Sequence, residues 1–247
     1  MNLSIVGLKN IPYLKEGENL EKFIAESIKD SDFSIEDNNV LCIASKIVSI
    51  SENQVLSLKQ VQVSDEAKEI QKSIPRKDPR IIEIMLNLVD RDLSRLDIKK
   101  NYIGCRLENG LKLTSGGIDK KSVDEVFLLP KNPDASAKRI SEYLKLSLGK
   151  NVAVVITDSD GREDKRGATQ VAIGIYGIPP LRKTAVIDSN GETIKFQEET
   201  LCDMIAASAG LVMGQRRTGI PAVIIKGIEY EWSETTNIKD AINESSN

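Results

Sequence analysis

Residues 152–177 constrain this chain more than any other segment, because they place a polar cluster between two apolar runs. The first run, residues 152–156, is rich in Val and Ile, and the second covers residues 171–176. Short apolar runs bounded by turn residues are typical of buried strands. We therefore expect two core strands, with the Asp-Ser-Asp cluster at residues 158–160 just past the end of the first.

This Asp-Ser-Asp cluster supports two interpretations. Carboxylate and hydroxyl oxygens past the end of a buried strand are a common way to hold a hard cation beside a cleft. Arg162, Lys165 and Arg166 follow directly and would suit a phosphate. Alternatively, the cluster is a polar turn, since Asp, Ser and Gly are the usual turn residues. The sequence leaves both a metal-and-phosphate site and a plain turn open.

The absence of histidine from the 247 residues restricts the chemistry that this chain can perform. It excludes Ser-His and Cys-His nucleophile systems and every His-ligated metal site. The three cysteines are far apart and form no C-x-x-C pair, which argues against zinc-finger and iron–sulfur sites. A metal site in this chain would use oxygen ligands, which favours Mg²⁺ or Mn²⁺ over zinc.

The composition is that of an ordinary soluble protein, with 40% hydrophobic and 29% charged residues. A net charge of -3 with interspersed signs gives no electrostatic footprint for nucleic acid. No apolar run approaches the length of a membrane span, and the first ten residues lack a signal-peptide pattern. We expect a cytoplasmic protein that binds neither nucleic acid nor membrane.

The order of the expected elements favours an α+β fold with mixed sheets, hairpins and packed helices. Further strands are expected at residues 3–8, 40–44, 126–129 and 222–226, and hairpins over 102–113 and 185–196. Helices are expected at residues 18–29, 65–74, 79–93, 132–148 and 198–213. The polar segment from Ser233 should be loosely held, so we divide the chain into a domain of residues 1–230 and a tail of residues 231–247.

Several separated segments together resemble one family, the ligases that add L-glutamate to the deazaflavin precursor of coenzyme F-420. The strongest match is residues 156–162 (Ile-Thr-Asp-Ser-Asp-Gly-Arg). The other matching segments are residues 11–12 (Ile-Pro), 15–17 (Lys-Glu-Gly), 44–49 (Ala-Ser-Lys-Ile-Val-Ser), 116–119 (Gly-Gly-Ile-Asp), 133–137 (Pro-Asp-Ala-Ser-Ala), 166–167 (Arg-Gly), 171–174 (Val-Ala-Ile-Gly), 211–215 (Leu-Val-Met-Gly-Gln) and 219–223 (Gly-Ile-Pro-Ala-Val). Their order and spacing fit the family over roughly residues 3 to 227.

The resemblance implies a set of functional residues. Asp119, Asp158, Ser159 and Gln215 would ligate two Mg²⁺ or Mn²⁺ ions, and Asp119, Asp158 and Arg162 would be catalytic. The residues that it implies for contacts to GTP are Ile11, Pro12, Tyr13, Leu14, Ser45, Lys46, Ser122, Met213, Gly214, Gln215, Arg216, Arg217, Thr218, Gly219 and Ile220. The family's fold, again by resemblance, has two intertwined subdomains and assembles as a homodimer. Its reaction activates a carboxylate as an acyl phosphate, which the amine of L-glutamate then attacks.

This chain departs from the family pattern mainly at expected substrate contacts. The family usually has a phosphate-binding Lys where Ile50 stands, and an Asn that touches the nucleotide where Ser122 stands. Three hypotheses follow: a GTP-dependent glutamate ligase of the F-420 type, a related amide ligase with another acceptor or nucleotide, and a homologue that binds nucleotide or cofactor without catalysis. If the missing charge matters, Ile50→Lys should tighten GTP binding.

Overall fold

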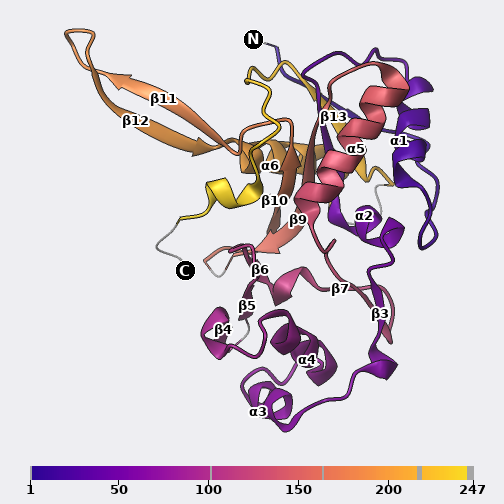
Figure 1. Cartoon of the computed structure of the whole chain (residues 1–247). Coiled ribbons are helices and arrows are strands. Elements are labelled where there is room, and N and C mark those ends of the chain that lie inside the picture. The colour runs from indigo at the N-terminus through magenta and orange to yellow at the C-terminus, as the bar shows by residue number, and fades with distance from the viewer. Residues whose placement is uncertain (1, 101, 163, 216–218, 244–247) are drawn as a thin grey trace.

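A five-stranded sheet forms the centre of the molecule in the computed structural model, which describes residues 2–100, 102–162, 164–215 and 219–243 (Figure 1). The strand order is β1-β13-β2-β9-β10. The bounds are β1 Ser4–Gly7, β2 Val40–Ala44, β9 Ala153–Gly161, β10 Ala168–Tyr176 and β13 Ala222–Lys226. Only the β2–β9 pair in this sheet is parallel, and the other neighbours are antiparallel. The predicted α+β class is confirmed.

A buried apolar cluster covers each face of this sheet. One face packs against α1 (Leu20–Lys29) and α5 (Pro133–Leu148), and the other packs against α6 (Leu201–Met213). α5 matches its prediction because Asn132 accepts a hydrogen bond from Ala135 N at the start and Gly149 adopts a left-handed φ of 69° at the end. The central strands bury apolar side chains on both faces, which explains why their runs are continuously apolar.

The strand β9 is longer than expected and continues through the Asp-Ser-Asp cluster to Gly161. It pairs with β10 along its whole length, with Asp158 opposite Val171 and Asp160 opposite Thr169. The prediction that these polar residues lie past the end of the strand is therefore wrong, and so is the alternative of a polar turn. Asp158 lies at the end of the buried part of β9, and Ser159 and Asp160 extend the hairpin beyond it.

A second body of structure, residues 55–128, lies below the sheet in Figure 1, and we call it the inserted lobe. Its helices are α3 (Asp65–Ser73) and α4 (Pro79–Leu88). Its strands form two small sheets, β3 (Val55–Ser57), β8 (Glu125–Phe127) and β7 (Asp119–Lys120), and β4 (Leu96–Lys99), β5 (Tyr102–Arg106) and β6 (Lys112–Thr114). A separate buried cluster, which includes Leu58, Ile82, Met85 and Val126, fills its interior. Whether the two bodies are intertwined subdomains in the predicted sense stays a prediction.

The helix α4 ends earlier than predicted, at Leu88 instead of residue 93. Asp90 and Arg91 have positive φ values of 53° and 61°, which a right-handed helix cannot accommodate. A short 3₁₀ helix, η2 (Leu93–Arg95), then leads into β4. The apolar periodicity that suggested a longer helix continues across this break.

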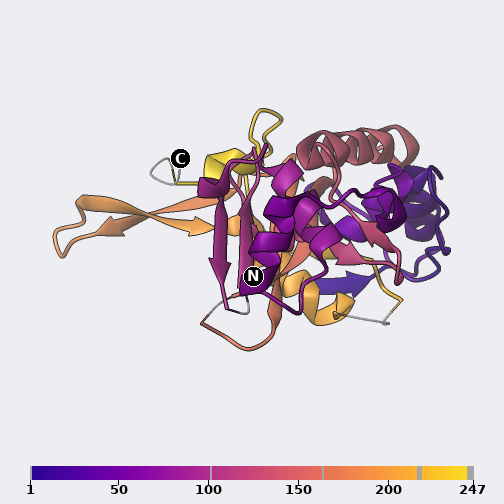
Figure 2. The ribbon, with the colours of Figure 1, turned by 90° about the horizontal axis from the view of Figure 1, so that it is seen from below.

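A two-stranded hairpin, β11 (Leu181–Ile187) and β12 (Thr193–Thr200), projects away from the rest of the molecule (Figures 1 and 2). It is longer than predicted, and α6 begins at Leu201 instead of residue 198 because β12 pairs with β11 as far as Thr200. Ile187, Ile194 and Phe196 are each at least 60% exposed on it. An isolated hairpin of this kind is marginal in water by itself.

Residues 236–241 pack against the body of the molecule, so the expectation of a loosely held segment is wrong there. Ile238 is 2% exposed, and the hydroxyl of Thr236 donates a hydrogen bond to the Ile178 carbonyl at 3.1 Å. Just before it, Trp232 meets Tyr176 edge to face. The boundary at residue 230 stays a prediction. Among the described residues, no helix has the length and apolar character needed to cross a membrane.

Candidate functional site

The pairing of β2 with β9 builds the first half of the site. The two strands run parallel with Ala44 opposite Thr157, so the residues that follow each partner lie side by side. Ser45 begins the helix α2 (Ser45–Ser51) at this point, and its hydroxyl donates a hydrogen bond to Oδ1 of Asp158 at 2.8 Å. Register alone thus brings together two residues that are 113 positions apart.

The inserted lobe supplies the second half of the site. Asp119, in β7, forms an ion pair with the ammonium of Lys46 at 2.8 Å. The same ammonium lies 5.5 Å from the centre of the Phe127 ring. Lys46 follows Ser45 in the first turn of α2. Adjacent residues of α2 therefore reach one acid in each body of the molecule.

The two acids differ in their surroundings. Asp158 is only 7% exposed, whereas the side chain of Asp119 is 44% exposed. The pKa of Asp158 is raised to about 7, mainly by burial, while the hydrogen bond from Ser45 acts in the opposite direction and the nearby charge of Asp119 adds to the increase. Two carboxylates that oppose each other's ionisation would both gain from a cation bound between them.

A strained loop holds Asp119 in place. Ser115, Gly116 and Gly117 all have positive φ, between 57° and 69°. A Cβ on Gly117 would lie 2.6 Å from the Leu129 side chain, so this position requires glycine. Just before the loop, Thr114 N donates to Oδ1 of Asp160 at 2.8 Å, which ties the inserted lobe to β9. Asp160 therefore acts as a link between the two bodies in this structure.

The donor chemistry of this site fits a hard cation. It offers two carboxylates and the hydroxyl of Ser45, which are oxygen ligands of the kind that Mg²⁺ prefers. The described residues contain no group of three or more Asp, Glu, Cys or His side chains placed to hold a metal. A bound ion would therefore complete its coordination with hydroxyl, amide, water or substrate oxygens.

Two of the predicted metal ligands lie apart from this pair of acids. Side chains alternate along a strand, so Ser159 points to the opposite face of β9 from Asp158. Its backbone N–H instead favours ionisation of the Asp158 carboxylate and lowers its pKa. Gln215 lies exposed just past α6 and makes no hydrogen bond with either acid within the described ranges. Metal binding by Ser159 and Gln215 stays a prediction.

The predicted nucleotide contacts are spread over several segments. In the loop before α1, Tyr13 is fully exposed and Leu14 is buried in the core, with Ile11 partly buried and Pro12 exposed beside them. Ser122 lies in the turn after β7, where its hydroxyl is 3.3 Å from a Glu125 carboxylate oxygen.

The segment after α6 is described only in part. Met213 is buried, Gly214 has a positive φ of 62°, Gly219 is exposed and Ile220 is partly buried against the Gly7 backbone. Arg216, Arg217 and Thr218 lie outside the described residues. The nucleotide-binding roles of the whole set stay predictions.

Arg162 lies beyond the end of β9 and is exposed. It lines an open pocket of about 530 Å³, together with Asp160 and, on α6, Asp203 and Met204. In the described part of the chain it makes no ion pair with Asp119 or Asp158. The structure thus brings together Ser45, Lys46, Asp119 and Asp158 but not Arg162, whose catalytic role stays a prediction.

One further residue reaches the site without having been predicted there. The ammonium of Lys77 donates a hydrogen bond to the hydroxyl of Ser115, in the strained loop before Asp119. The sequence showed only a basic segment at residues 75–77 between two helices. No local pattern could have found this contact, because the two residues are 38 positions apart.

The candidate site of this α+β protein thus combines one carboxylate from the central sheet with one from the inserted lobe, and its potential ligands are oxygen atoms. Residues 9–227 match the family model described as F420-0:Gamma-glutamyl ligase. The chain is 34% identical to the coenzyme F420:L-glutamate ligase of Methanosarcina mazei, over 98% of this chain and 92% of that protein. It is 31% identical to the protein of that name from Methanothermobacter thermautotrophicus, over 94% and 91%, and 34% identical to that from Methanocaldococcus jannaschii, over 91% and 88%. The chain belongs to the F420-0:gamma-glutamyl ligase family.

Proposed function

We propose that this chain joins L-glutamate to a deazaflavin precursor of coenzyme F-420, with GTP as co-substrate and Mg²⁺ or Mn²⁺ ions bound at Asp119 and Asp158. The observation that carries the proposal is the convergence of the Ser45–Asp158 and Lys46–Asp119 pairs in a member of this ligase family. Oxygen donors beside lysine ammoniums suit a reaction in which phosphate charge must be bound and neutralised.

The proposed reaction has two balanced steps. A carboxylate oxygen of the precursor attacks the terminal phosphorus of GTP, and GDP leaves with the electrons of the broken bond. The amine of L-glutamate then attacks the acyl carbon, phosphate leaves, and the nitrogen loses a proton to give the amide. Positioning of the reactants supplies much of the acceleration in such a sequence.

The residues of the site have distinct roles in this proposal. Asp119 and Asp158 would hold the metal, with Ser159 and Gln215 as further ligands, and the metal would neutralise charge on the phosphates. Ser45 fixes the orientation of the Asp158 carboxylate through its 2.8 Å hydrogen bond. Lys46 pairs with Asp119 at 2.8 Å here, and it would be free to bind a phosphate oxygen if Asp119 held a metal ion.

A ligation assay read by mass spectrometry tests this function. The purified chain is mixed with L-glutamate, the unglutamylated deazaflavin precursor, Mg²⁺ and Mn²⁺, and either GTP or ATP. A mass gain of one glutamate residue that requires GTP supports the proposal. Nucleotide hydrolysis without that gain would instead indicate another acceptor, and metal-dependent nucleotide binding without turnover would indicate a homologue without catalysis.

We also propose that the chain acts as a homodimer, as expected from the family resemblance. The projecting hairpin supports this, because Ile194 and Phe196 are about two-thirds exposed on a two-stranded element that extends away from the other described elements. Light scattering should give twice the chain mass, and Phe196→Glu should reduce it to one chain mass. A wild-type mass of one chain would contradict the dimer.

A further inference from the structure

The ammonium of Lys77 is half-buried and forms no ion pair with an acidic side chain among the described residues. Its recorded side-chain hydrogen bond goes to the hydroxyl of Ser115, and no carboxylate within the described residues lies at ion-pairing distance from it. Most other charged residues of the inserted lobe are paired, for example Arg80 with Asp78 and Asp124. Holding an ammonium partly out of water against a neutral hydroxyl is unfavourable, which points to a negatively charged partner beyond the described residues of the chain.

The backbone around Lys77 is fixed, so its position does not depend on a long flexible loop. Lys77 N donates to the Ile74 carbonyl at 3.0 Å, where α3 ends. The next residue, Asp78, accepts a hydrogen bond from Arg80 N at 2.9 Å and begins α4. The guanidinium of Arg80 then joins Asp78 to Asp124, in the turn before β8. Lys77 therefore extends from a braced helix–helix connection.

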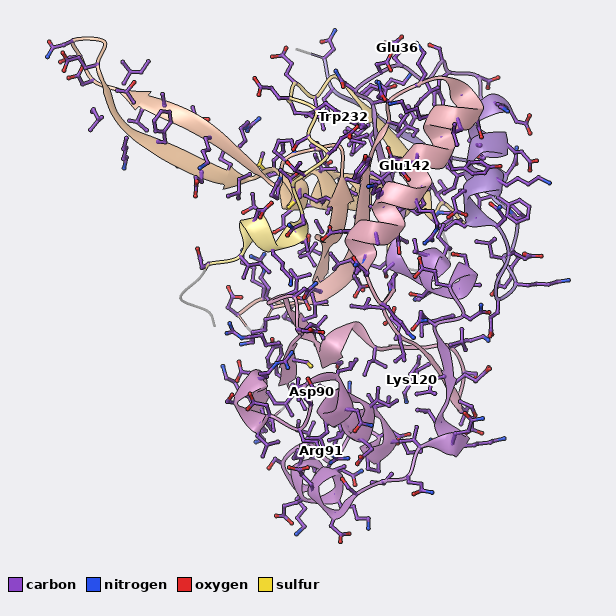
Figure 3. The ribbon with its side chains drawn as sticks, viewed as in Figure 1. Glu36, Asp90, Arg91, Lys120, Glu142 and Trp232 are labelled. Carbon is purple, nitrogen blue, oxygen red and sulfur yellow. The ribbon has the colours of Figure 1, made fainter. Side chains whose placement is uncertain are left out.

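The charged groups that act on Lys77 are Lys120 and Asp119, which lie at the candidate site. Burial lowers the pKa of Lys77, Lys120 lowers it further, and Asp119 acts in the opposite direction. Figure 3 labels Lys120, which follows Asp119 in β7 between α4 and the sheet. Lys46 pairs with Asp119 at 2.8 Å, so three lysines, Lys46, Lys77 and Lys120, lie near the Asp119 carboxylate. Two of these lysines, Lys77 and Lys120, come from the inserted lobe, and this group of ammoniums suits a bound anion.

We infer that Lys77 binds an oxyanion of the substrates, a phosphate of the nucleotide or a carboxylate of the acceptor, at the Asp119–Asp158 site. This inference rests on the proposed function. It also accounts for the missing charge at Ile50, which is partly buried against the main core and offers no cation. In this arrangement the inserted lobe contributes both a carboxylate, Asp119, and the ammonium that balances the bound anion.

The test compares three substitutions of one lysine. Lys77→Met removes the charge, Lys77→Gln removes it while keeping a donor for Ser115, and Lys77→Arg keeps it. The matched control is Lys68→Met, which removes a lysine from the same lobe whose ammonium pairs with Asp65 at the exposed surface. Calorimetry with Mg²⁺ and a non-hydrolysable GTP analogue measures binding without turnover, and steady-state ligation separates KM for GTP, KM for the precursor and kcat.

A phosphate-binding role predicts that Lys77→Met and Lys77→Gln weaken the GTP analogue at least tenfold, with Lys77→Arg recovering most of the loss. A carboxylate-binding role predicts unchanged analogue affinity and a tenfold higher KM for the precursor. Lys68→Met should match the wild type in each assay. Thermal unfolding of every variant is measured alongside.

Two results would overturn the inference. If the wild type ligates glutamate and Lys77→Met leaves both KM values and the analogue affinity unchanged, Lys77 binds no substrate oxyanion. If Ser115→Ala, which keeps the ammonium, weakens binding and lowers Tm as much as Lys77→Met, then Lys77 only holds the loop. A wild type that neither ligates nor binds nucleotide refutes the proposed function itself, which separates the two failures.

Discussion

The sheet and the inserted lobe each supply one acid to the site, but they hold it in different ways. Asp158 belongs to a nine-residue strand whose inner part is fully buried. Asp119 belongs to a two-residue strand, and its side chain is 44% exposed. Because β9 is buried in the core, its register with β2 is strongly specified, and this register determines which residues lie beside Asp158. Asp119 instead depends on a few named links between the two bodies, namely Thr114 with Asp160 and Lys46 with Asp119 itself.

The two acids therefore differ in what fixes their positions. The acid in the sheet cannot move without disturbing β2 and β9, which lie in the centre of the sheet. The acid in the inserted lobe is instead held by a body that has its own buried cluster.

The largest effect is expected from Asp158→Asn, which removes the buried carboxylate and keeps its shape. Ligation should fall by roughly 10²–10³-fold or more, because an electrostatic group of the site is lost. Thermal stability should not fall, since burial already disfavours the charged form of Asp158. Calorimetric titration with Mn²⁺ should show weakened binding. Asp188→Asn, in the hairpin turn, is the control, and strong metal binding by Asp158→Asn would exclude this acid as a ligand.

The next prediction concerns the two cores. Ile82→Ala in the inserted lobe and Ile43→Ala in the sheet each remove a fully buried side chain and should cost about 2–5 kcal/mol of unfolding free energy. Hydrogen exchange separates them: Ile82→Ala should raise exchange mainly within residues 55–128, and Ile43→Ala should raise it throughout the sheet. Equal exchange across the chain in both variants would show that the two bodies unfold as one.

The sheet was more predictable from the sequence than the inserted lobe, for a physical reason. The bounds of β2 and β13 match their predictions because strands buried on both faces read as continuous apolar runs. β9 did not, because its polar half is held by pairing with β10 and not by burial. The local pattern of apolar residues therefore predicts which strand residues are buried, but it does not predict how far a strand continues through hydrogen-bonded pairing.

The residues alone marked the Asp158–Asp160 cluster as a candidate metal site, and the family resemblance added the other members of the site. That resemblance selected Ser45, Lys46, Asp119 and Asp158, which the structure brings together. Lys77 was missed because its contact with Ser115 depends on how α3 and α4 pack, and nothing in the residues around it reports that packing. Contacts between distant segments of the chain are the part that local reasoning cannot supply.

A smaller effect is expected from Glu83→Gln in the inserted lobe. Glu83 is 4% exposed, and although burial alone would raise its pKa, hydrogen bonds from Ser64 and Arg91 hold it below the usual value. Arg91, labelled in Figure 3, also pairs with Glu66. A lowered pKa stabilises the fold above the usual Glu value of about 4.3 and loses that stabilisation as the pH falls through the folded value.

Urea unfolding between pH 7 and pH 3 measures this prediction. The wild type should be more stable than Glu83→Gln at pH 7, and the difference should shrink as the pH falls below about 4. The control is Glu69→Gln, whose carboxylate pairs with Lys72 at the exposed surface of α3. A stability difference that is constant with pH would mean that the Glu83 network contributes through packing and not through its charge.

The smallest effect is expected from Gly149→Ala, in comparison with Gly117→Ala. Both glycines have a φ of 69°, but no atom lies within 4 Å of a Cβ built at Gly149, whereas one built at Gly117 would lie 2.6 Å from Leu129. Gly149→Ala should cost about 1 kcal/mol of unfolding free energy, from backbone strain alone, and leave ligation unchanged. Gly117→Ala should cost more and also lower ligation, because the 115–117 loop positions Asp119. Denaturant unfolding and the ligation assay measure both, and equal loss of activity in the two variants would show that the loop does not control the position of the acid.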